Sequence, residues 1–388
     1  MERNNLPPKV CILRSNPVKP DSRVEKEALA LACAGYSVEI VCWDRDSNHK
    51  AVEDFLELGE MRVPIIRIGC KASFGEGLKN IIPYLKFQFF LRAWIRRHKD
   101  NIDILHACDF DTAFFTYKLA RHKRIKVVFD IFDFLGSDRR TGKQKFLVAL
   151  QYGIINRSDA TIICTEERKK QIFGSKPKRL VVVHNTPTEQ QMPKILHNFL
   201  QNNEKIKVCY VGILQDGRLL REIGDYFSKH PEIELHIGGF GILEDYFKEL
   251  SNRYDNIKFY GRIQYANTLE LEHNCDIMLA IYDPAISNHR FAAPNKFYES
   301  LFLGKPVIMV KNTGMSEVVK DNNIGVLIDY SEEGFKEGID KLISEKADWA
   351  SMSERMKKLY KDKYSWTEME KRLINLYAEL SNEKNIDR

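Results

Sequence analysis

Short runs of β-branched and other apolar residues recur along the chain, and each is followed by a stretch whose apolar positions have helical spacing. In the first half these runs lie at residues 9–13, 38–43, 65–68, 104–107, 126–129, 160–164 and 180–183. Strands that are apolar on both faces and alternate with helices are typical of a parallel sheet covered by helices on both sides. The first half therefore predicts a doubly wound α/β domain.

Residues 186–205 interrupt this pattern with a polar stretch of the composition expected for an interdomain connection. The pattern then returns, with apolar runs at 206–211, 233–237, 257–260, 276–281, 306–310 and 325–328. A chain of 388 residues exceeds what one hydrophobic core usually supports. We therefore predict two Rossmann-like domains, the first over residues 1–188 and the second over residues 206–362.

Composition narrows the class of protein. The hydrophobic fraction of 44% and the charged fraction of 29% are ordinary for a globular protein, and a net charge of +6 does not indicate nucleic acid as a partner. No apolar run approaches the roughly 18 residues needed to cross a bilayer, and the N-terminus lacks a secretory signal. Cys11, Cys42, Cys164 and Cys209 lie inside apolar runs and no C-x-x-C pair occurs, so we expect reduced, buried thiols and a cytoplasmic protein.

A strand–loop–helix junction in the second half carries a cation. The strand ends at Tyr210-Val211-Gly212, and residues 213–217 lead to Arg218 at the start of a helical pattern. Ligands of open α/β sheets bind at such carboxyl edges, where a helix N-terminus and a guanidinium suit a diphosphate. The alternative is a capped helix with a solvated arginine, and this junction alone does not decide between them.

A second glycine-rich turn follows the next strand, at His236–Gly241. Gly239 and Gly241 would let a ligand approach the backbone closely. Many α/β proteins use glycine at this place for tight turning alone, so a purely structural interpretation stays open.

Segment 293–308 predicts a loop, a helix and a buried strand, because a proline lies near the helix start and a glycine follows its last turn. Asn295 and Glu299 are one turn apart on one helix face, so their amide and carboxylate can project together. A carboxylate at Glu299 suits two ribose hydroxyls. The alternative is a surface ion pair between Glu299 and Lys296, worth at most a few tenths of a kcal/mol.

With further motifs in the first half, these segments make the chain resemble a glycosyltransferase of the GT-B architecture, in the large retaining group called family 4. The resemblance covers nearly the whole chain and includes residues 21–28, 35–38, 103–109 and 182–187. It implies two Rossmann-like domains that face each other across a cleft. The stretch Tyr364-Ser365-Trp366 before an amphipathic helix resembles the segment that crosses back in this architecture, so we expect residues 363–388 to pack on the first domain.

The resemblance implies that the protein moves a sugar from a nucleotide-sugar, such as a UDP- or GDP-sugar, to an acceptor without a metal or other cofactor. Arg218 matches the cation that the family places on the donor diphosphate. Glu299 matches the second glutamate of the family's paired motif, which binds the donor ribose. The donor base would lie near Arg262 and Ile263. The other residues expected in this donor site are Gly212, Gly239, Asn295 and Lys296.

The chain departs from the family pattern at three positions. Phe291 stands where the first glutamate of the pair is expected, and Ile213 stands where an arginine often follows the glycine of the first junction. Phe132 takes the place of a frequent histidine. The motifs therefore define the donor site better than the catalytic centre.

Glycosyl transfer leaves negative charge on the diphosphate while the sugar becomes oxocarbenium-like. Arg218, Lys296 and helix amides would stabilise that charge, because preorganised donors in a water-poor site favour the transition state. Acceptor activation would come from strand ends of the first half. The candidate catalytic residues there are His106, Asp109, Asp130 and Asp133. Strand-end aspartates also cap helices, and His106 also fits a hydrogen-bonded core histidine.

Residues 81–99 interleave aromatic and cationic side chains on a predicted helix. Such a helix can lie in an anionic membrane interface, although a core-packed helix with a basic solvent edge has the same pattern. The membrane interpretation predicts a lipid-linked saccharide acceptor, a surface polysaccharide as product, and a peripheral location on the inner face of the membrane.

Two other functions fit the same architecture. A nucleotide-sugar epimerase would release no nucleoside diphosphate in net turnover and would need no acceptor. A catalytically silent relative would bind nucleotide or scaffold a biosynthetic complex. Sustained acceptor-dependent turnover distinguishes the transferase from both, because fold alone does not decide function.

Overall fold

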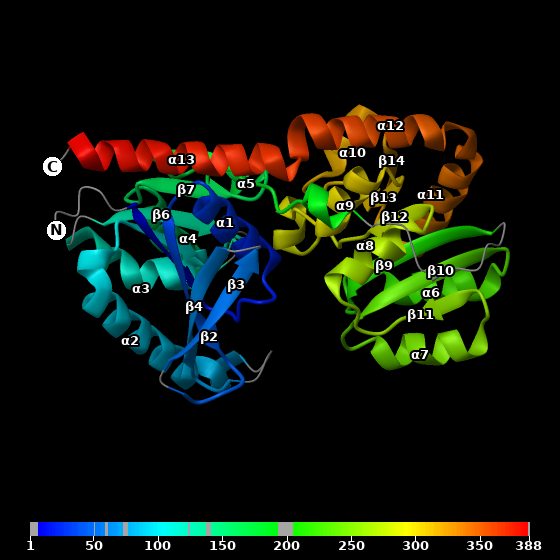
Figure 1. Ribbon diagram of the computed structural model, residues 1–388. Coiled ribbons are helices and arrows are strands. Elements are labelled where there is room, and N and C mark those ends of the chain that lie inside the picture. Colours follow the sequence, from blue (N-terminus) through cyan, green and yellow to red (C-terminus); the bar gives the residue numbers. More distant parts are fainter. Residues whose placement is uncertain are drawn as a thin grey trace. The chain divides into compact units, whose positions relative to one another are not determined.

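The computed structural model describes residues 7–49, 51–58, 61–72, 77–122, 125–136, 141–192 and 205–386 (Figure 1). The chain divides into two compact units, of which the first comprises residues 1–183 and 369–388 and the second residues 184–368. Most of the polar connection expected at 186–205 lies outside the described residues.

The first unit is built on an eight-stranded sheet with the strand order β3-β4-β2-β1-β5-β6-β7-β8. Its described strand pairs are parallel except for β3 with β4. The strands are β1 (Lys9–Arg14), β2 (Ser37–Asp44), β3 (Val52–Leu58), β4 (Met61–Gly69), β5 (Ile104–Cys108), β6 (Lys126–Ile131), β7 (Ala160–Ile163) and β8 (Leu180–Val182).

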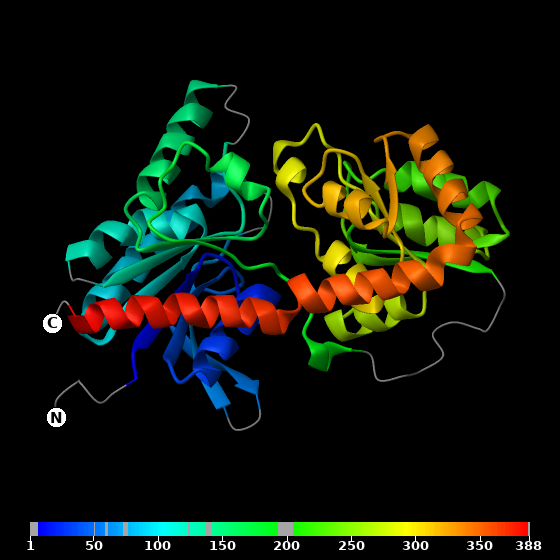
Figure 2. The ribbon, with the colours of Figure 1, turned by 90° about the horizontal axis from the view of Figure 1, so that it is seen from above.

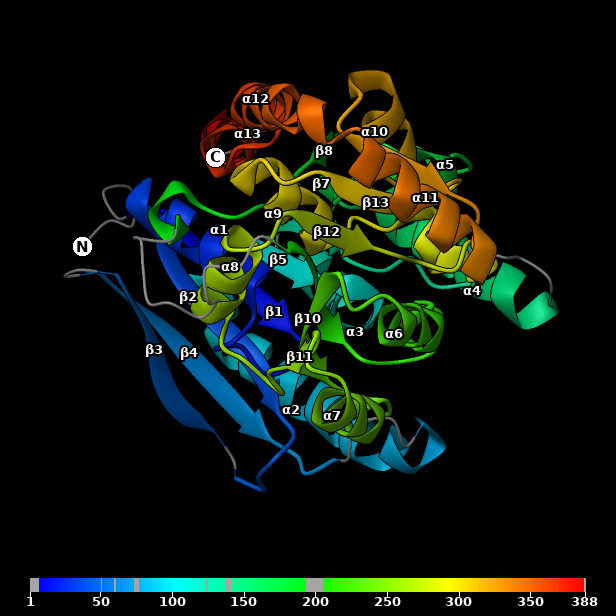
Figure 3. The same ribbon diagram turned by 90° about the vertical axis from the view of Figure 1, so that its right-hand side faces the viewer.

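The antiparallel strand β3 was not predicted, and its sequence explains why. Its residues Glu53, Asp54 and Glu57 interrupt the apolar run that marks the other strands. Charged side chains suit a strand that lies at the edge of its sheet, where they discourage pairing with other chains. Figure 3 shows β3 and β4 together at this edge.

Helices cover both faces of the first sheet. They are α1 (Ser22–Cys33), α2 (Ile81–His98), α3 (Asp109–His122), α4 (Gly142–Ile155), α5 (Arg168–Gln171) and α13 (Trp366–Ile386). Cys11 and Leu13 of β1 share one core cluster with Phe87 and Leu91 of α2. The two-residue period of a strand thus places half of its apolar side chains under α2 and half under the opposite layer.

The last helix, α13, belongs to the first unit from Met369 onward. Its apolar positions recur with helical spacing and are buried, at Met369, Leu373, Leu376, Tyr377 and Leu380. The ring of Tyr377 packs edge-on against that of Tyr36, with 5.8 Å between centroids. Figure 2 shows α13 lying along the first unit.

The boundary between the units differs slightly from the predicted one at residue 188. The first unit ends at Val183, one residue beyond β8, and His184 already belongs to the second unit. The physical reason is a hydrogen bond, because Nδ1 of His184 lies 2.6 Å from the hydroxyl of Tyr298 in that unit.

The second unit contains a six-stranded parallel sheet with the order β11-β10-β9-β12-β13-β14. Its strands are β9 (Ile206–Ile213), β10 (Ile233–Phe240), β11 (Ile257–Phe259), β12 (Ile277–Ala280), β13 (Val307–Val310) and β14 (Gly325–Ile328). Its helices are α6 (Leu220–Lys229), α7 (Glu244–Arg253), α8 (Tyr265–His273), α9 (Asn295–Leu303), α10 (Ser316–Asn322), α11 (Glu332–Ser344) and α12 (Trp349–Leu359).

Two core clusters flank this second sheet. Tyr210 and Leu279 join one cluster, whereas their chain neighbours Cys209 and Met278 join the other. Adjacent residues of a strand point to opposite faces, so both faces are buried under helices. The prediction of an α/β fold with two Rossmann-like parallel-sheet domains is confirmed.

Candidate functional site

Two glycines lie side by side at the carboxyl edge of the second sheet. Gly212 near the end of β9 pairs with Gly239 near the end of β10. A Cβ atom on Gly239, whose φ is +142°, would lie 1.8 Å from the carbonyl oxygen of Gly212. No side chain fits there, so glycine at position 239 lets the ends of β9 and β10 pack closely, at the edge where ligands of open α/β sheets bind.

Lys296 points its ammonium group at this glycine edge from the first turn of α9. A Cβ atom on Gly212 would lie 2.6 Å from its Nζ, which also lies 4.6 Å from the centre of the Tyr210 ring. Burial lowers the pKa of Lys296, but Tyr282, Tyr210 and the carboxylate of Glu299 outweigh it and raise the pKa above its usual value. The side chain therefore stays a cation at neutral pH.

Arg218 lies in the loop between β9 and α6, where the predicted diphosphate contact belongs. Its guanidinium stacks 3.7 Å from the centre of the Tyr282 ring. Its Nη1 also lies 3.0 Å from Nε2 of His289, which must accept because a guanidinium only donates. An aromatic ring and a neutral imidazole hold this cation without neutralising it.

Glu299 follows Lys296 on α9 and is 3% exposed. It accepts a hydrogen bond from Tyr265, at the start of α8, and it lies against the carboxyl group of Glu272, which is 1% exposed. Burial and the charge of Glu299 raise the pKa of Glu272 well above its usual value. No described N–H or hydroxyl group donates to Glu272, so a proton on Glu272 that is shared with Glu299 satisfies the pair.

The remaining predicted donor residues lie at the same edge. Asn295 is exposed at the start of α9, and its Oδ1 accepts a hydrogen bond of 3.1 Å from Asn185. Arg262 and Ile263 follow β11, with the guanidinium 4.7 Å from the centre of the Phe240 ring. One edge of one sheet thus collects three cations, one carboxylate and a pair of closely packed glycines.

Sequence reasoning missed Tyr265, Glu272, Tyr282 and His289. One signal could have found Glu272, because a lone acid stands in line with apolar positions of α8 at helical spacing. A buried carboxyl in such a stripe needs a partner inside the protein. No comparable pattern marks His289, which lies in the short turn Ser287–Phe291.

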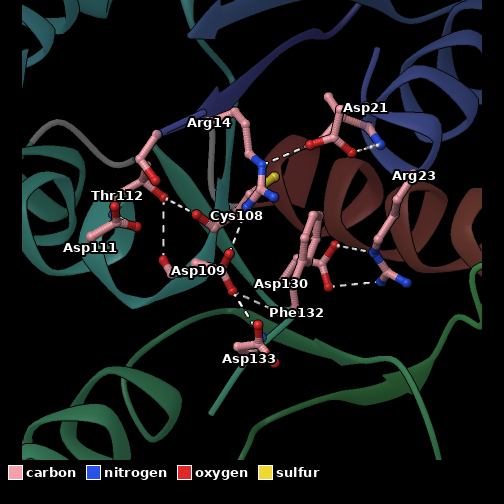
Figure 4. A network of polar contacts seen from close by, with 12 residues as sticks. Arg14, Asp21, Arg23, Cys108, Asp109, Asp111, Thr112, Asp130, Phe132 and Asp133 are labelled. Carbon is pink, nitrogen blue, oxygen red and sulfur yellow. Dashed lines mark hydrogen bonds and ion pairs between the residues drawn. The ribbon is translucent and has the colours of Figure 1, made fainter. Parts of the chain in front are cut away.

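A second polar cluster lies at the carboxyl edge of the first sheet (Figure 4). Arg14 ends β1 and forms ion pairs with Asp109 at 2.6 Å and Asp21 at 2.8 Å. Oδ1 of Asp109 accepts hydrogen bonds from the backbone N–H groups of Phe132 and Asp133, at 3.0 and 3.1 Å. Both oxygens of Asp109 are therefore engaged, and the residue fixes the turn after β6.

Asp109, at the start of α3, and Asp133, in the turn after β6, differ in environment. Burial raises the pKa of Asp109 to about 6, although the guanidinium of Arg14 and the N–H group of Asp133 oppose the rise. The side chain of Asp133 is 64% exposed and lies 3.3 Å from Nη2 of Arg168. Of these two predicted catalytic residues, Asp133 is the more accessible to an acceptor.

His106 and Asp130 are wholly buried beneath that edge. Arg23 holds Asp130 through Nε at 3.1 Å and Nη2 at 2.8 Å, a bidentate pair. Nδ1 of His106 lies 2.6 Å from the hydroxyl of Tyr377, and its Nε2 lies 3.4 Å from Asp130. Neither side chain is exposed, so both lie in the core, and their predicted catalytic role stays a prediction.

The positions that depart from the family pattern have ordinary surroundings. The ring of Phe132 lies between two guanidinium groups, 4.3 Å from Arg14 and 4.9 Å from Arg23, which explains an aromatic residue there. Ile213 is 51% exposed at the end of β9. Phe291 is half-buried and ends the turn that carries His289.

One group of side chains in the described residues has the spacing of a metal site. Ligand atoms of His106, Cys108 and Asp130 lie within 4.8 Å of one another. Arg23 already occupies both oxygens of Asp130, and burial raises the pKa of Cys108 well above its usual value, which keeps the thiol neutral. A metal ion prefers the thiolate and would displace the guanidinium, so these residues suit an ion-pair cluster better.

Residues 81–98 of the segment predicted to meet a membrane form helix α2. Phe87, Leu91 and Ile95 are buried, whereas Ile82 and Phe89 are 66% and 67% exposed. The helix therefore has both the core face and the exposed apolar face that the two interpretations require. Within the described ranges, no helix is long and apolar enough to cross a bilayer.

The chain is similar to several known proteins in sequence and in fold. The O-antigen biosynthesis glycosyltransferase WbnH of Escherichia coli is 24% identical over 195 residues, which cover 50% of this chain and 53% of that protein. The match thus spans about half of the curated relative. Sucrose-phosphate synthase from Thermosynechococcus elongatus has a TM-score of 0.76 at 14% identity, over 97% of this chain and 99% of that one.

HepE of Anabaena, solved in complex with UDP and glucose, has a TM-score of 0.70 at 13% identity, over 96% of this chain and 99% of that one. These likenesses establish the shared fold. Two family descriptions match the sequence itself, namely the glycosyl transferase 4-like domain over residues 20–186 and glycosyl transferases group 1 over residues 165–366, which is just over half of the chain. The chain therefore belongs to the family of glycosyl transferases group 1.

Proposed function

We propose that this protein is a glycosyltransferase that binds a nucleotide-sugar at the carboxyl edge of the second sheet and transfers the sugar to a saccharide acceptor. The observation that carries the proposal is that Arg218, in the loop after β9, and Lys296 and Glu299, on α9, lie at the carboxyl edge of the second sheet. The two cations suit a diphosphate and the carboxylate suits the two ribose hydroxyls. The complex of HepE with UDP and glucose supports a UDP-sugar as the first donor to test.

The leaving group of this reaction is a nucleoside diphosphate whose negative charge grows as the glycosidic bond breaks. Arg218 and Lys296 are held by aromatic rings, so their charge remains available at the place where the diphosphate would lie. We propose that these cations do the work that a metal ion does in other phosphate chemistry, and that turnover is insensitive to chelators.

We propose a retaining outcome. In the first unit both oxygens of Asp109 are engaged and Asp130 is buried against Arg23, so neither is placed to take a proton from an acceptor. The exposed carboxylate of Asp133 lies 3.3 Å from Nη2 of Arg168, and a guanidinium so close makes it a weaker base. The leaving diphosphate itself can take that proton on the face from which it departs, which places the new bond on the same face. The anomeric configuration of the product, read by proton NMR, tests this step, and inversion would exclude it.

The acceptor and the location are proposed from α2 and from WbnH. The exposed apolar face of α2 and its flanking cations suit an anionic membrane surface, and an O-antigen is a surface polysaccharide. We therefore propose a lipid-linked saccharide acceptor at the inner face of the membrane. Sedimentation with phosphatidylglycerol vesicles should capture the protein, phosphatidylcholine vesicles should not, and Phe89→Ser should weaken capture.

The donor site is tested by thermal shift and turnover with UDP-, GDP-, ADP- and TDP-sugars. A ligand at one hundred times its Kd stabilises a protein by about 2.7 kcal/mol, enough to identify the base. Arg218→Ala and Glu299→Ala should remove the shift, whereas Arg221→Ala, three residues further on in α6 and facing Tyr246, should keep it.

The other possible outcomes of this experiment would indicate different functions. Binding with exchange of sugar epimers and no acceptor dependence would indicate the epimerase. Binding with no turnover under any acceptor would indicate the silent relative. No shift with any nucleotide-sugar would refute the donor site.

A further inference from the structure

A groove of about 700 Å³ opens at the carboxyl edge of the first sheet, between the residues that follow β4 and the start of α2. Ile82, Leu85, Phe89 and Phe90 line its helix side and are between 40% and 67% exposed. This volume lies within the ~300–1,000 Å³ of small-molecule sites. Large apolar side chains that gather around a concavity and remain exposed indicate a ligand that covers them.

The charged groups of the groove are cationic. Among the described lining residues, Lys71 and Lys86 are exposed lysines, and no aspartate or glutamate is present. His49 also lines the groove, and its Nε2 lies 2.9 Å from Asp44 at the end of β2. An apolar groove with lysines at its rim complements a ligand that has a hydrocarbon part and an anionic part.

The order of strands places this groove near the polar cluster of the same unit. β4, β2, β1 and β5 are consecutive neighbours in the sheet. Since neighbouring strands lie ~4.8 Å apart, the end of β4 is about 10 Å along the edge from Arg14 at the end of β1. Arg45 follows β2 between them, with its guanidinium 4.2 Å from the centre of the Trp43 ring. A line of cations therefore leads from the groove to Arg14 and the Asp133 turn.

We propose that this groove binds the hydrocarbon chain of a lipid-phosphate-linked saccharide acceptor, with Lys71 and Lys86 at the phosphate and the saccharide directed along the sheet edge toward Arg14. The assignment rests on the proposed transfer reaction and names the substrate class of its acceptor side. The groove supplies the position of the acceptor, and the exposed face of α2 supplies the contact from which a membrane-held lipid enters it.

The charge pattern favours this occupant over a bilayer phospholipid or a second protein. A bilayer surface needs only an apolar face and scattered cations, which Arg96 and Arg97 at the far end of α2 also supply. A groove lined by apolar side chains and two lysines suits one chain with one anionic head, and its place on the sheet edge puts the sugar on the side of the sheet where Arg14 and Asp133 lie.

The test is the binding of farnesyl phosphate, measured by titration calorimetry with the full-length protein. Farnesol, inorganic phosphate and dihexanoyl phosphatidylglycerol serve as comparison ligands. We expect farnesyl phosphate to bind at least tenfold more tightly than each of them. Phe89→Ser should raise the Kd at least tenfold and Lys86→Ala at least fivefold. Arg97→Ala, an exposed cation of the same helix outside the groove, should change it less than twofold.

Three results would overturn the proposal. Equal binding by wild type, Phe89→Ser and Lys86→Ala would place the ligand elsewhere. Binding that is lost in Arg218→Ala would place the phosphate at the donor site. Binding of dihexanoyl phosphatidylglycerol as tight as that of farnesyl phosphate would indicate a bilayer lipid as the natural occupant.

Failure of the groove and failure of the donor site give different results. If the donor site exists, Phe89→Ser and Lys86→Ala should keep the thermal shift with nucleotide-sugars, whether or not they bind farnesyl phosphate. Farnesyl phosphate binding without any nucleotide-sugar shift would leave a lipid-phosphate site and refute the transferase. In acceptor assays, Lys86→Ala should lower kcat/KM for a polyprenyl-phosphate-linked sugar at least fivefold and leave that for a short soluble saccharide unchanged.

Discussion

Arginine and lysine side chains have different kinds of partners at the two sheet edges. In the second unit Arg218 and Lys296 lie on the rings of Tyr282 and Tyr210, and neither forms an ion pair with a described carboxylate. In the first unit Arg14 and Arg23 are each held by two carboxylates, at distances of 2.6 to 3.2 Å.

Aromatic partners suit cations that bind a ligand, whereas carboxylate partners suit cations that hold the structure together. An aromatic ring stabilises a cation modestly and leaves its charge to be neutralised by a ligand. A bidentate carboxylate neutralises the cation and fixes the backbone on both sides. We therefore propose that cations of the first kind lie where an anion binds and that those of the second kind stabilise the surrounding structure.

The largest test of this comparison is Arg218→Ala. Removing a preorganised cation from a developing diphosphate charge should lower kcat/KM about 1,000-fold, or roughly 4 kcal/mol. The free energy of unfolding should change by less than about 1 kcal/mol, because the guanidinium makes no ion pair. Steady-state kinetics and urea unfolding measure the two effects. A large loss of stability with unchanged kinetics would reverse the assignment of the two edges.

Asp130→Asn should show the opposite pattern. The amide cannot neutralise Arg23, which is 4% exposed, so the variant leaves a buried charge with one fewer partner. We expect a loss of about 3 kcal/mol in the free energy of unfolding, read from urea titration. Donor-induced thermal shifts should survive in the folded protein at low temperature, whereas their disappearance would argue that Asp130 serves ligand binding.

Asp109 gives a smaller, pH-dependent test. Its folded pKa of about 6 lies above the usual value of an aspartate, so the folded protein binds the proton more tightly than the unfolded chain. The stabilisation from this group is therefore complete below about pH 4 and is lost as the pH rises through 6. Between pH 4 and 7 the stability of wild type should fall relative to that of Asp109→Asn by about 2 kcal/mol. A difference that stays constant with pH would show that Asp109 is charged throughout.

The smallest expected effect belongs to Glu272. Glu272→Gln keeps a neutral donor beside Glu299, so the KM for the donor should change less than about twofold. Glu272→Ala removes the donor from a buried carboxylate, and its KM should rise about fivefold. Kinetics at saturating acceptor measure both. Equal effects of the two substitutions would mean that packing, and not the shared proton, positions Glu299.

The same contrast explains what the sequence could predict. Local patterns were enough for the parallel strands and for the helix at 295–303, but not for the charged edge strand β3. They also gave the proposed donor residues Gly212, Arg218 and Glu299, which lie near strand ends and helix starts that the chain marks nearby. The ion pairs and hydrogen bonds of the first unit could not be predicted, because the partners are distant in sequence. Arg14 meets Asp109 95 positions away, and His106 meets Tyr377 271 positions away. Periodicity gives the buried face of a helix but not the side chain that lies opposite.

The apolar stripe of α13 has a consequence for how the protein is made. Met369, Leu373 and Tyr377 complete the core of the first unit, yet the ribosome adds them only after the whole second unit, residues 184–368. Domains usually fold in the order of their synthesis, with the N-terminal one first. Here the second unit is fully synthesised while the first still lacks a covering helix. The nascent first unit must therefore wait, with part of its sheet uncovered, until α13 has been made, and this interval is when a chaperone would be needed.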